Sequence, residues 1–381
     1  MTKIVVAGDV HVGIYNNFAK PIKDDNINDM TKESLDGLQQ VLDYAGDNDV
    51  DYVVINGDLF DHRGTLDVRI MNRVSKMFKD FLDSSTHDCT IYLLAGNHDQ
   101  IDNSPIPENS LAFLEGLNDS SNNTSIKVID RPDTEMPSHV GVDSNVDFYF
   151  LPYSEDVKML KDWLNEAVKG LDPRQTNFLF AHVGVEGATD GGLYTHRLGG
   201  AFAVGDLHPS DFDYVLLSHY HNRQQMGKAK NMWYIGSTTQ KSFSDEGQDK
   251  GFDVFDVTSD PKSEKAKVKH EFHKVSYTPF ITVDMKTTKL DDKGLHDLMK
   301  KAHVRIKTYD KEQAKELQTM ASDGDMNISI SLKEEQKGKE SRLGLDATSS
   351  EAQIVSKYTK AYYPNVRKKA LEVLRKAQEE N

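Results

Sequence analysis

Residues 4–11 read IVVAGDVH, an apolar run that leads directly into the polar residues Asp9 and His11. Four further apolar runs are followed by polar residues in the same way. They are YVVI (52–55) before Asp58, IYLLA (91–95) before Asn97 and His98, FLFA (178–181) before His182, and YVLLS (214–218) before His219 and His221. Runs of this length, rich in β-branched and aromatic residues, are typical of strands buried on both faces. Open α/β sheets bind ligands at the carboxyl ends of their strands, so we expect these polar side chains to converge on one site.

Two amphipathic helices are predicted between the first three strands. Residues 31–46 and 65–82 carry apolar residues at helical spacing. The alternation of strands and helices predicts an α/β fold with parallel pairing and right-handed crossovers. By contrast, residues 118–147 are polar and rich in Asn, Ser and Asp, so we expect an irregular surface loop there.

The rest of the chain predicts a second sheet and smaller additions. Runs near 232–235, 252–257 and 268–275, several with period-two alternation, indicate antiparallel pairing in a second sheet, and hence a two-sheet sandwich. A small α+β module follows, with strands expected at 280–285 and 326–332 and helices at 291–303 and 310–321. A charged linker and two C-terminal helices, separated near Pro364, complete the chain. The predicted divisions are a main domain at 1–277, the module at 278–332, the linker at 333–349 and the helical segment at 350–381.

The composition limits the class of protein. The formal net charge of −15 argues against the extended basic surface of a nucleic-acid coat protein, although cation-binding carboxylates account for part of it. Cys89 is the sole cysteine, which excludes an intrachain disulfide and a cysteine-based zinc site and fits a reducing compartment. The start of the chain lacks a signal-peptide pattern, and no apolar run approaches the roughly 20 residues that cross a bilayer. We expect a soluble, cytoplasmic protein that does not bind membranes.

The polar residues at the strand ends predict a metal centre. Carboxylate and amide oxygens together with imidazole nitrogens suit divalent ions that also hold water, and manganese or iron fits this mixture best. The two oxygens of Asp58 can bridge two ions, which lie about 3.5–4 Å apart in two-metal hydrolytic sites. Each motif alone is weak evidence, but their common position at strand ends makes coincidence the poorer explanation. The predicted ligands are Asp9, His11, Asp58, Asn97, His182, His219 and His221.

A glycine-rich segment, Gly184–Gly205, leaves the sheet directly after His182 and contains His196 and Arg197. It is either a simple surface excursion or a substrate-binding loop. Its position next to a predicted ligand favours substrate contact.

These residues resemble the calcineurin-like metallophosphoesterases, whose pattern runs D-x-H, G-D-x-x-D, G-N-H-D/E, a lone H and G-H-x-H. The matching residues are 9–11, 57–61, 96–99, His182 and 218–221, with Ser218 in place of the usual glycine. The resemblance implies an αββα sandwich with two ions. One ion is expected on Asp9, His11, Asp58 and His221, and the other on Asp58, Asn97, His182 and His219. It further implies that His98 contacts the phosphate and helps to protonate the leaving oxygen.

A second stretch narrows the resemblance to the SbcD-like DNA nucleases, the nuclease subunits of double-strand-break repair complexes. Residues 234–251 are similar to their Y-x-G-S…S-F…E…K-G signature, and residues 276–280 are similar to the start of their capping domain. The resemblance implies manganese-dependent exonuclease and endonuclease activity in DNA repair or recombination. It also implies a homodimer and an SbcC-like ATPase partner of the SMC type, on whose coiled coil the C-terminal helices are expected to dock.

One catalytic position departs from this family. The histidine of its second motif is Asp61 here, and the neighbouring His62 is a candidate to replace it. We therefore count Asp61 and His62 with His98 as candidate catalytic residues. The candidate DNA contacts are Arg63, Arg69, His196 and Arg197.

Two other functions stay open. A metallophosphoesterase that acts on small phosphoesters or phosphoproteins needs neither the 234–251 signature nor partner-binding helices. A non-enzymatic protein on the same fold is expected to have lost ligands, and none of the seven is missing here.

Overall fold

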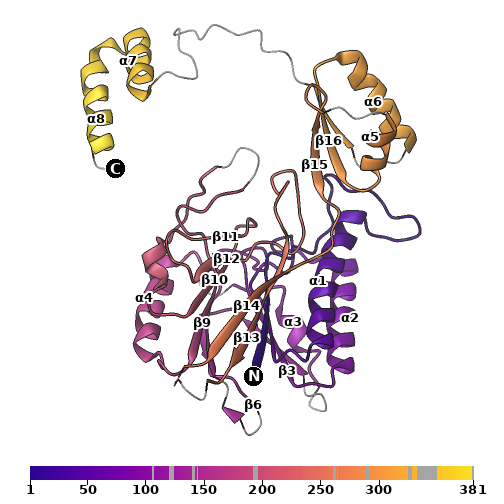
Figure 1. Cartoon of the computed structure of the whole chain (residues 1–381), viewed down its shortest axis with the longest axis vertical. Helices are drawn as coiled ribbons and strands as arrows, with labels where there is room; N and C mark the ends of the chain where they lie inside the picture. Colours follow the sequence, from indigo (N-terminus) through magenta and orange to yellow (C-terminus); the bar gives the residue numbers. More distant parts are fainter. Residues whose placement is uncertain are drawn as a thin grey trace.

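The computed structural model describes residues 1–104, 107–119, 124–139, 142–143, 145–191, 196–260, 263, 265–288, 292–324, 328–332 and 350–379. Within these residues, two six-stranded sheets pack face to face, with helices on their outer faces (Figure 1). Among these helices, α1 (Asp29–Asp47) and α2 (Val68–Ser84) cover the first sheet, and α4 (Val157–Ala167) covers the second. This layer order confirms the predicted two-sheet α/β sandwich.

The first sheet has the strand order β14-β13-β1-β2-β3-β4. The strands are β1 (Thr2–Ala7), β2 (Tyr52–Ile55), β3 (Cys89–Leu94), β4 (Thr124–Ile129), β13 (Gly251–Thr258) and β14 (Lys267–Lys274). From β1 to β4 the pairing is parallel, which confirms the alternating strand and helix unit. The edge pair β13 and β14 is antiparallel.

The second sheet has the order β11-β12-β10-β9-β8-β5. Its strands are β5 (Asp133–Glu135), β8 (Val146–Leu151), β9 (Thr176–His182), β10 (Tyr214–Ser218), β11 (Gln224–Gln225) and β12 (Met232–Tyr234). The four strands β8, β9, β10 and β12 are parallel, so their carboxyl ends meet at one edge. Short elements outside the two sheets are the ribbon β6 (Ser138–His139) with β7 (Val142–Asp143), α3 (Ala112–Glu115), η1 (Val168–Gly170) and η2 (Val204–Leu207).

Aromatic side chains fill the space between the two sheets. Phe148, Phe150, Phe178 and Phe180 of the second sheet are fully buried there together with Phe255 of the first. Burying a large apolar side chain contributes about 1.5–3 kcal/mol, so this layer fixes the sheets against each other. Two loop sets from different sheets can then form one site.

Three details of the predicted strand arrangement are wrong. β13 and β14, expected in the second sheet, extend the first one, because β13 pairs with β1 from Thr2–Val257 to Val6–Asp253. Within the expected irregular loop, residues 124–129 form the edge strand β4 of the first sheet and residues 133–135 form the edge strand β5 of the second. In the small module, residues 303–308 form the strand β16, which is not among the predicted strands.

The small module has its own sheet and core. β15 (Phe280–Asp284), β16 (His303–Thr308) and β17 (Ile328–Leu332) pair in parallel, and α5 (Asp292–Met299) and α6 (Lys311–Gly324) connect them. Its buried residues include Val283, Leu295, Met299, Val304, Ile306 and Leu317.

The described C-terminal residues form α7 (Glu351–Tyr362), η3 (Pro364–Val366) and α8 (Arg367–Glu379). Ser350 begins α7 with a capping box, since its hydroxyl accepts from the Gln353 N–H and the Gln353 side chain accepts from the Ser350 N–H. The predicted linker, 333–349, lies outside the described residues, and the division into four parts remains a prediction. No helix in the described part of the chain is long and apolar enough to cross a membrane.

Candidate metal centre

The seven predicted ligands lie at the carboxyl ends of five strands, six of them in the loops that follow and His182 as the last residue of β9 (Thr176–His182). Asp9 and His11 follow β1, Asp58 follows β2 and Asn97 follows β3 in the first sheet, while the three remaining histidines lie at the ends of β9 and β10 in the second. Among the described residues, three groups of His and Asp have potential ligand atoms within 4.8 Å of one another. They are Asp9–His11–His221, Asp58–His182–His219 and His11–Asp61–His98. The convergence expected from the strand-end positions is therefore present.

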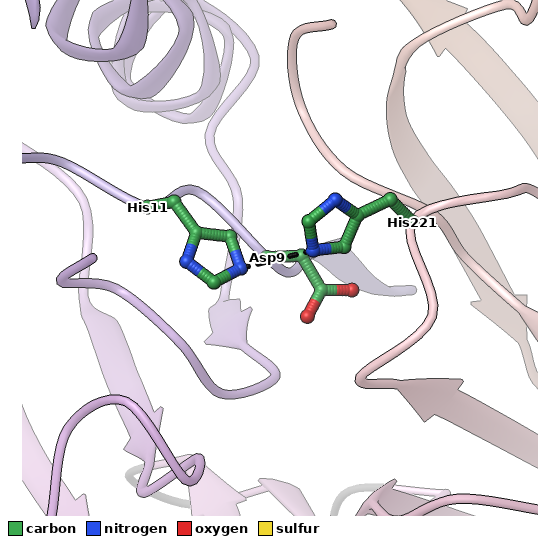
Figure 2. Close-up of side chains that lie close together, drawn as sticks. All are labelled: Asp9, His11 and His221. Carbon is green, nitrogen blue, oxygen red and sulfur yellow. Dashed lines mark hydrogen bonds between the residues drawn. The ribbon is translucent and has the colours of Figure 1, made fainter. Parts of the chain in front are cut away.

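The first group consists of Asp9, His11 and His221. Figure 2 shows the two imidazole rings facing each other beside the Asp9 carboxylate, and the two Nε2 atoms are 3.0 Å apart. Imidazole nitrogens bind a metal at about 2.0–2.1 Å. Two such nitrogens on adjacent positions of one ion are therefore about 3 Å apart, and this pair fits a shared divalent ion.

The second group surrounds the Asn97 amide oxygen. His219 Nδ1 is 2.9 Å and His182 Nε2 is 3.2 Å from Asn97 Oδ1, and His182 Nε2 is also 3.2 Å from Asp58 Oδ2. The same Asp58 oxygen is 3.6 Å from His11 Nε2 in the first group. Asp58 thus belongs to the second group and also lies close to the first, in the position that a bridging carboxylate needs.

The backbone of the centre is held in sparsely populated conformations. Asp9, His11, Asp58 and His219 have φ values of 48°, 49°, 53° and 103°. Such conformations cost about 1–3 kcal/mol for a residue with a side chain and persist where the surrounding structure enforces them. Strain on four predicted ligands is consistent with a site shaped for binding rather than for stability.

Gly57 and Gly96 allow the loops to approach each other. A Cβ on Gly57, whose φ is +92°, lies 2.0 Å from His182 Nδ1, and a Cβ on Gly96 lies 2.2 Å from Asp58 Oδ1. Any side chain at either position therefore displaces a predicted ligand.

Buried charges oppose one another in the centre. Burial raises the pKa of the Asp58 carboxyl, but His182 and His11 outweigh this effect and hold that pKa well below its ordinary value. Burial lowers the pKa of His182, but the Asp58 carboxylate raises it more, to about 9. Burial and the neighbouring His182 lower the pKa of His219 to about 4. In the metal-free protein, His182 and Asp58 therefore form an ion pair, while His219 is neutral and able to donate its lone pair.

Two candidate catalytic residues, Asp61 and His98, belong to the third group, and the third candidate, His62, lies beside Asp61. His98 donates its backbone N–H to Asp58 Oδ1 at 2.9 Å, and its Nδ1 hydrogen-bonds to the Asp61 carbonyl oxygen. Asp61 directs one carboxylate oxygen to His11 Nδ1 at 3.4 Å and the other to His62 Nδ1 at 3.2 Å. The His62 side chain is 50% exposed, so it faces solvent beside the centre.

The candidate DNA contacts differ in how they are held. Arg69 makes a bidentate ion pair with Asp67, the N-cap of α2, at 2.9 and 2.7 Å. Arg63 donates to the Asn103 side chain. His196 and Arg197 are exposed in the loop after β9.

Two supporting residues are missing from the sequence-based site. The Asp99 carboxylate accepts from the Phe60 and Gly96 N–H groups, both at 3.0 Å, and so joins the loops after β2 and β3. The Asn56 carbonyl is 3.1 Å from His182 Nδ1, which leaves Nε2 to face Asn97 and Asp58. Asp99 lies two residues after Asn97, and Asn56 lies two residues before Asp58, so their closeness in the sequence points to both. Closeness in the sequence does not say which neighbour orients a ligand.

The sequence model of a protein family, described as calcineurin-like phosphoesterase, matches residues 2–223 of this chain. This range includes all seven predicted ligands. Protein 078R of Invertebrate iridescent virus 3, named as a candidate phosphoesterase, is 26% identical over 209 residues, covering 54% of this chain and 52% of that protein. One subunit of the nuclease SbcCD from Staphylococcus epidermidis is 25% identical over 281 residues, covering 67% of this chain and 66% of its own. Exonuclease subunit 1 of Enterobacteria phage T4 is 23% identical over 280 residues, covering 73% of this chain and 71% of that protein. The chain thus spans about half the length of the viral relative.

Proposed function

Because this chain belongs to the calcineurin-like phosphoesterase family, we propose that it is a two-metal phosphodiesterase whose substrate is DNA. The observation that carries the proposal is the pair of ligand groups on either side of Asp58, built from loops of both sheets. When bound, two divalent ions at such a centre polarise a phosphate and activate water for its hydrolysis. Manganese suits the mixed oxygen and nitrogen ligands.

Each side chain has a separate part in this proposal. Asp9, His11 and His221 hold one ion, Asn97, His182 and His219 hold the other, and Asp58 bridges them. His98 orients the substrate phosphate and donates a proton to the leaving oxygen, because it lies next to both groups and its Nδ1 is held by the Asp61 carbonyl. Asp61 aligns His11, and the exposed His62 is a further candidate proton donor.

DNA is favoured as the substrate by two observations. Two relatives that match more than two thirds of this chain are named as nuclease or exonuclease subunits. The signature at 234–251 lies at the centre, since Lys250 donates to the carbonyl of His221 at 2.7 Å. DNA is bound by a few residues instead of an extended basic surface. The proposed contacts are Arg63, Arg69, His196 and Arg197.

We also propose that the chain works as a homodimer with an SMC-type ATPase in DNA repair or recombination. The helix pair α7 and α8 exposes apolar side chains, including Ile354 at 44%, Tyr358 at 47% and Val373 at 59%. An amphipathic helix laid into an apolar groove is a common mode of recognition, and the coiled coil of such an ATPase offers one.

The experiment compares linear duplex DNA, supercoiled plasmid and bis(p-nitrophenyl) phosphate, each with and without Mn²⁺. We expect manganese-dependent cleavage of linear DNA and of the small ester. The matched variant is His98→Asn, which should keep both ions and the fold while slowing DNA cleavage by about 10²–10⁴-fold, as loss of acid catalysis does. Hydrolysis of bis(p-nitrophenyl) phosphate should fall less, because p-nitrophenolate leaves without needing a proton.

The alternative is a phosphoesterase for small esters or phosphoproteins, and the name of the viral relative favours it. Rapid hydrolysis of the small ester, together with intact DNA even after the ATPase is added, contradicts the DNA proposal and supports this alternative.

A further inference from the structure

Two lysines behind the centre donate to the backbone of the loops that carry the first ligand group. Lys241 Nζ is 2.6 Å from the carbonyl oxygen of Val10, the residue between Asp9 and His11. Lys250 Nζ is 2.7 Å from the carbonyl oxygen of His221 itself. Neither loop is near the lysines in sequence, so these bonds join three separate parts of the chain.

One carboxylate connects the two lysines. Asp245 Oδ1 accepts from Lys250 Nζ at 2.9 Å, and Asp245 Oδ2 accepts from the Lys241 backbone N–H at 3.0 Å. The side chains of Lys250 and Asp245 are 0% and 5% exposed. A lysine is rarely buried unless it is paired, because burying an uncompensated charge is costly. Asp245 compensates Lys250, and the third ammonium bond goes to Gln248 Oε1 at 2.8 Å.

These hydrogen bonds influence the distance between the ligand atoms of the first group. His11 follows a strand of the first sheet and His221 follows a strand of the second, so the 3.0 Å between their Nε2 atoms depends on how the two loops are held. The carbonyl bonds fix each loop from behind, and the Asp245 bridge fixes the two lysines relative to each other. Among the hydrogen bonds of the described residues, none joins a residue of the second group directly to Lys241, Asp245 or Lys250. His219 shares the loop of His221, whereas Asn56 and Asp99 hold the segments that carry His182 and Asn97.

We propose that Lys241, Asp245 and Lys250 are positioning residues that set the geometry of the ion site formed by Asp9, His11 and His221. This inference rests on the proposed metal centre. It assigns Lys241, Asp245 and Lys250 of the 234–251 segment to positioning the ligands rather than to contacting the substrate. Partners that orient metal ligands from outside typically change metal affinity by about 10–100-fold when they are removed.

The test measures Mn²⁺ binding to the metal-free full chain by equilibrium dialysis, with electron paramagnetic resonance to distinguish coupled ion pairs from single ions. Lys250→Met keeps the length of the side chain but removes the ammonium group. We expect one ion to bind with near-normal affinity and the other about 10–100-fold more weakly, with loss of the coupled-pair signal. The matched control is Lys3→Met, since Lys3 Nζ also donates to a backbone carbonyl, that of Asn48, at 2.6 Å but outside the centre.

A second variant keeps the inference testable if Lys250→Met does not fold. Asp245→Asn removes the compensating charge with little change in shape, and we expect the same ion to weaken. A merely structural role lowers the melting temperature of the metal-free variant without changing either affinity of the folded protein. Two unchanged affinities in a folded Lys250→Met or Asp245→Asn variant overturn the inference. If the unaltered chain itself fails to bind two ions, the proposed metal centre is what fails.

Discussion

His182 shows at the scale of one residue how the centre is prepared for metal. Its imidazole is fully buried, with Nδ1 3.1 Å from the Asn56 carbonyl oxygen and Nε2 3.2 Å from Asp58 Oδ2. Burial alone favours the neutral ring, but the Asp58 carboxylate raises the pKa to about 9. The proton on Nε2 therefore occupies the place that an ion needs.

A proton should leave His182 when the ion binds. Protonated His182 competes with the metal below its pKa of about 9, so affinity should rise with pH and level off above that value. Near pH 7.5 we expect release of about one proton for the second ion, and about tenfold weaker binding for each unit by which the pH falls. Calorimetry of Mn²⁺ binding in buffers of different ionisation enthalpy counts the protons. Binding without proton release at pH 7.5 contradicts the assignment of His182 as a ligand.

The sequence identifies the residues of the centre better than the contacts that hold them. The seven predicted ligand positions come from polar residues placed after apolar runs, because parallel strands bring their carboxyl ends to one edge. Asp99 and Lys250 act through bonds to Gly96 and His221, and no local pattern encodes such pairings. Their roles depend on the folded backbone.

At the scale of the element, it is easier to predict that a segment forms a strand than to predict which strand it pairs with. β13 is buried along nearly its whole length, yet its own residues do not say that it pairs with β1. β4 and β16 are short edge and module strands whose apolar residues alternate with Ser, Lys and Arg. Strand preference depends on the neighbours that a strand finds, so such segments are poorly predicted by composition.

The loop after β9 has an anchored base and an exposed tip. Val185 and Phe202 are buried in the second core and form a bridge, whereas His196 and Arg197 are exposed. The exposed Arg197, on a loop with a buried base, is suited to contact a phosphate backbone.

The double variant His196→Ala and Arg197→Ala should weaken DNA binding several-fold. It should also make binding less dependent on salt, because each cation that no longer neutralises a phosphate lowers the salt slope by about one. Hydrolysis of the small ester should be unchanged. Arg174→Ala is the matched control, because Arg174 precedes β9 and therefore lies at the opposite end of that strand. Equal decreases on DNA and on the small ester indicate damage to the metal centre instead of a weaker grip on DNA.

At the scale of the whole molecule, the C-terminal helices are a separate packed pair. The Arg367 guanidinium donates to Ser356 Oγ at 2.7 Å across the pair, while Tyr362, Tyr363 and Val366 remain about half exposed. Apolar side chains exposed together on a small unit are typical of an interface.

Truncation after Gly344 should therefore leave manganese-dependent hydrolysis of the small ester within about twofold of the full chain, because no proposed ligand is removed. It should abolish co-purification with the ATPase. A matched full-length variant, Tyr358→Asp with Val373→Asp, should have the same effect without loss of residues. Formation of the complex at full affinity by the truncated chain means that the helices are not the docking surface.

The central claim is that loops from both sheets build two adjacent ion sites that share Asp58. Anomalous diffraction at the manganese edge, from crystals of the full chain soaked in Mn²⁺, tests it most directly. We predict two peaks about 3.5–4 Å apart, the spacing of two-metal hydrolytic sites, one against His11 and His221 and the other against His182 and His219. Asp58→Ala crystals should lose both peaks or retain one at low occupancy. A single full peak, or two peaks that persist undiminished in Asp58→Ala, contradicts the account.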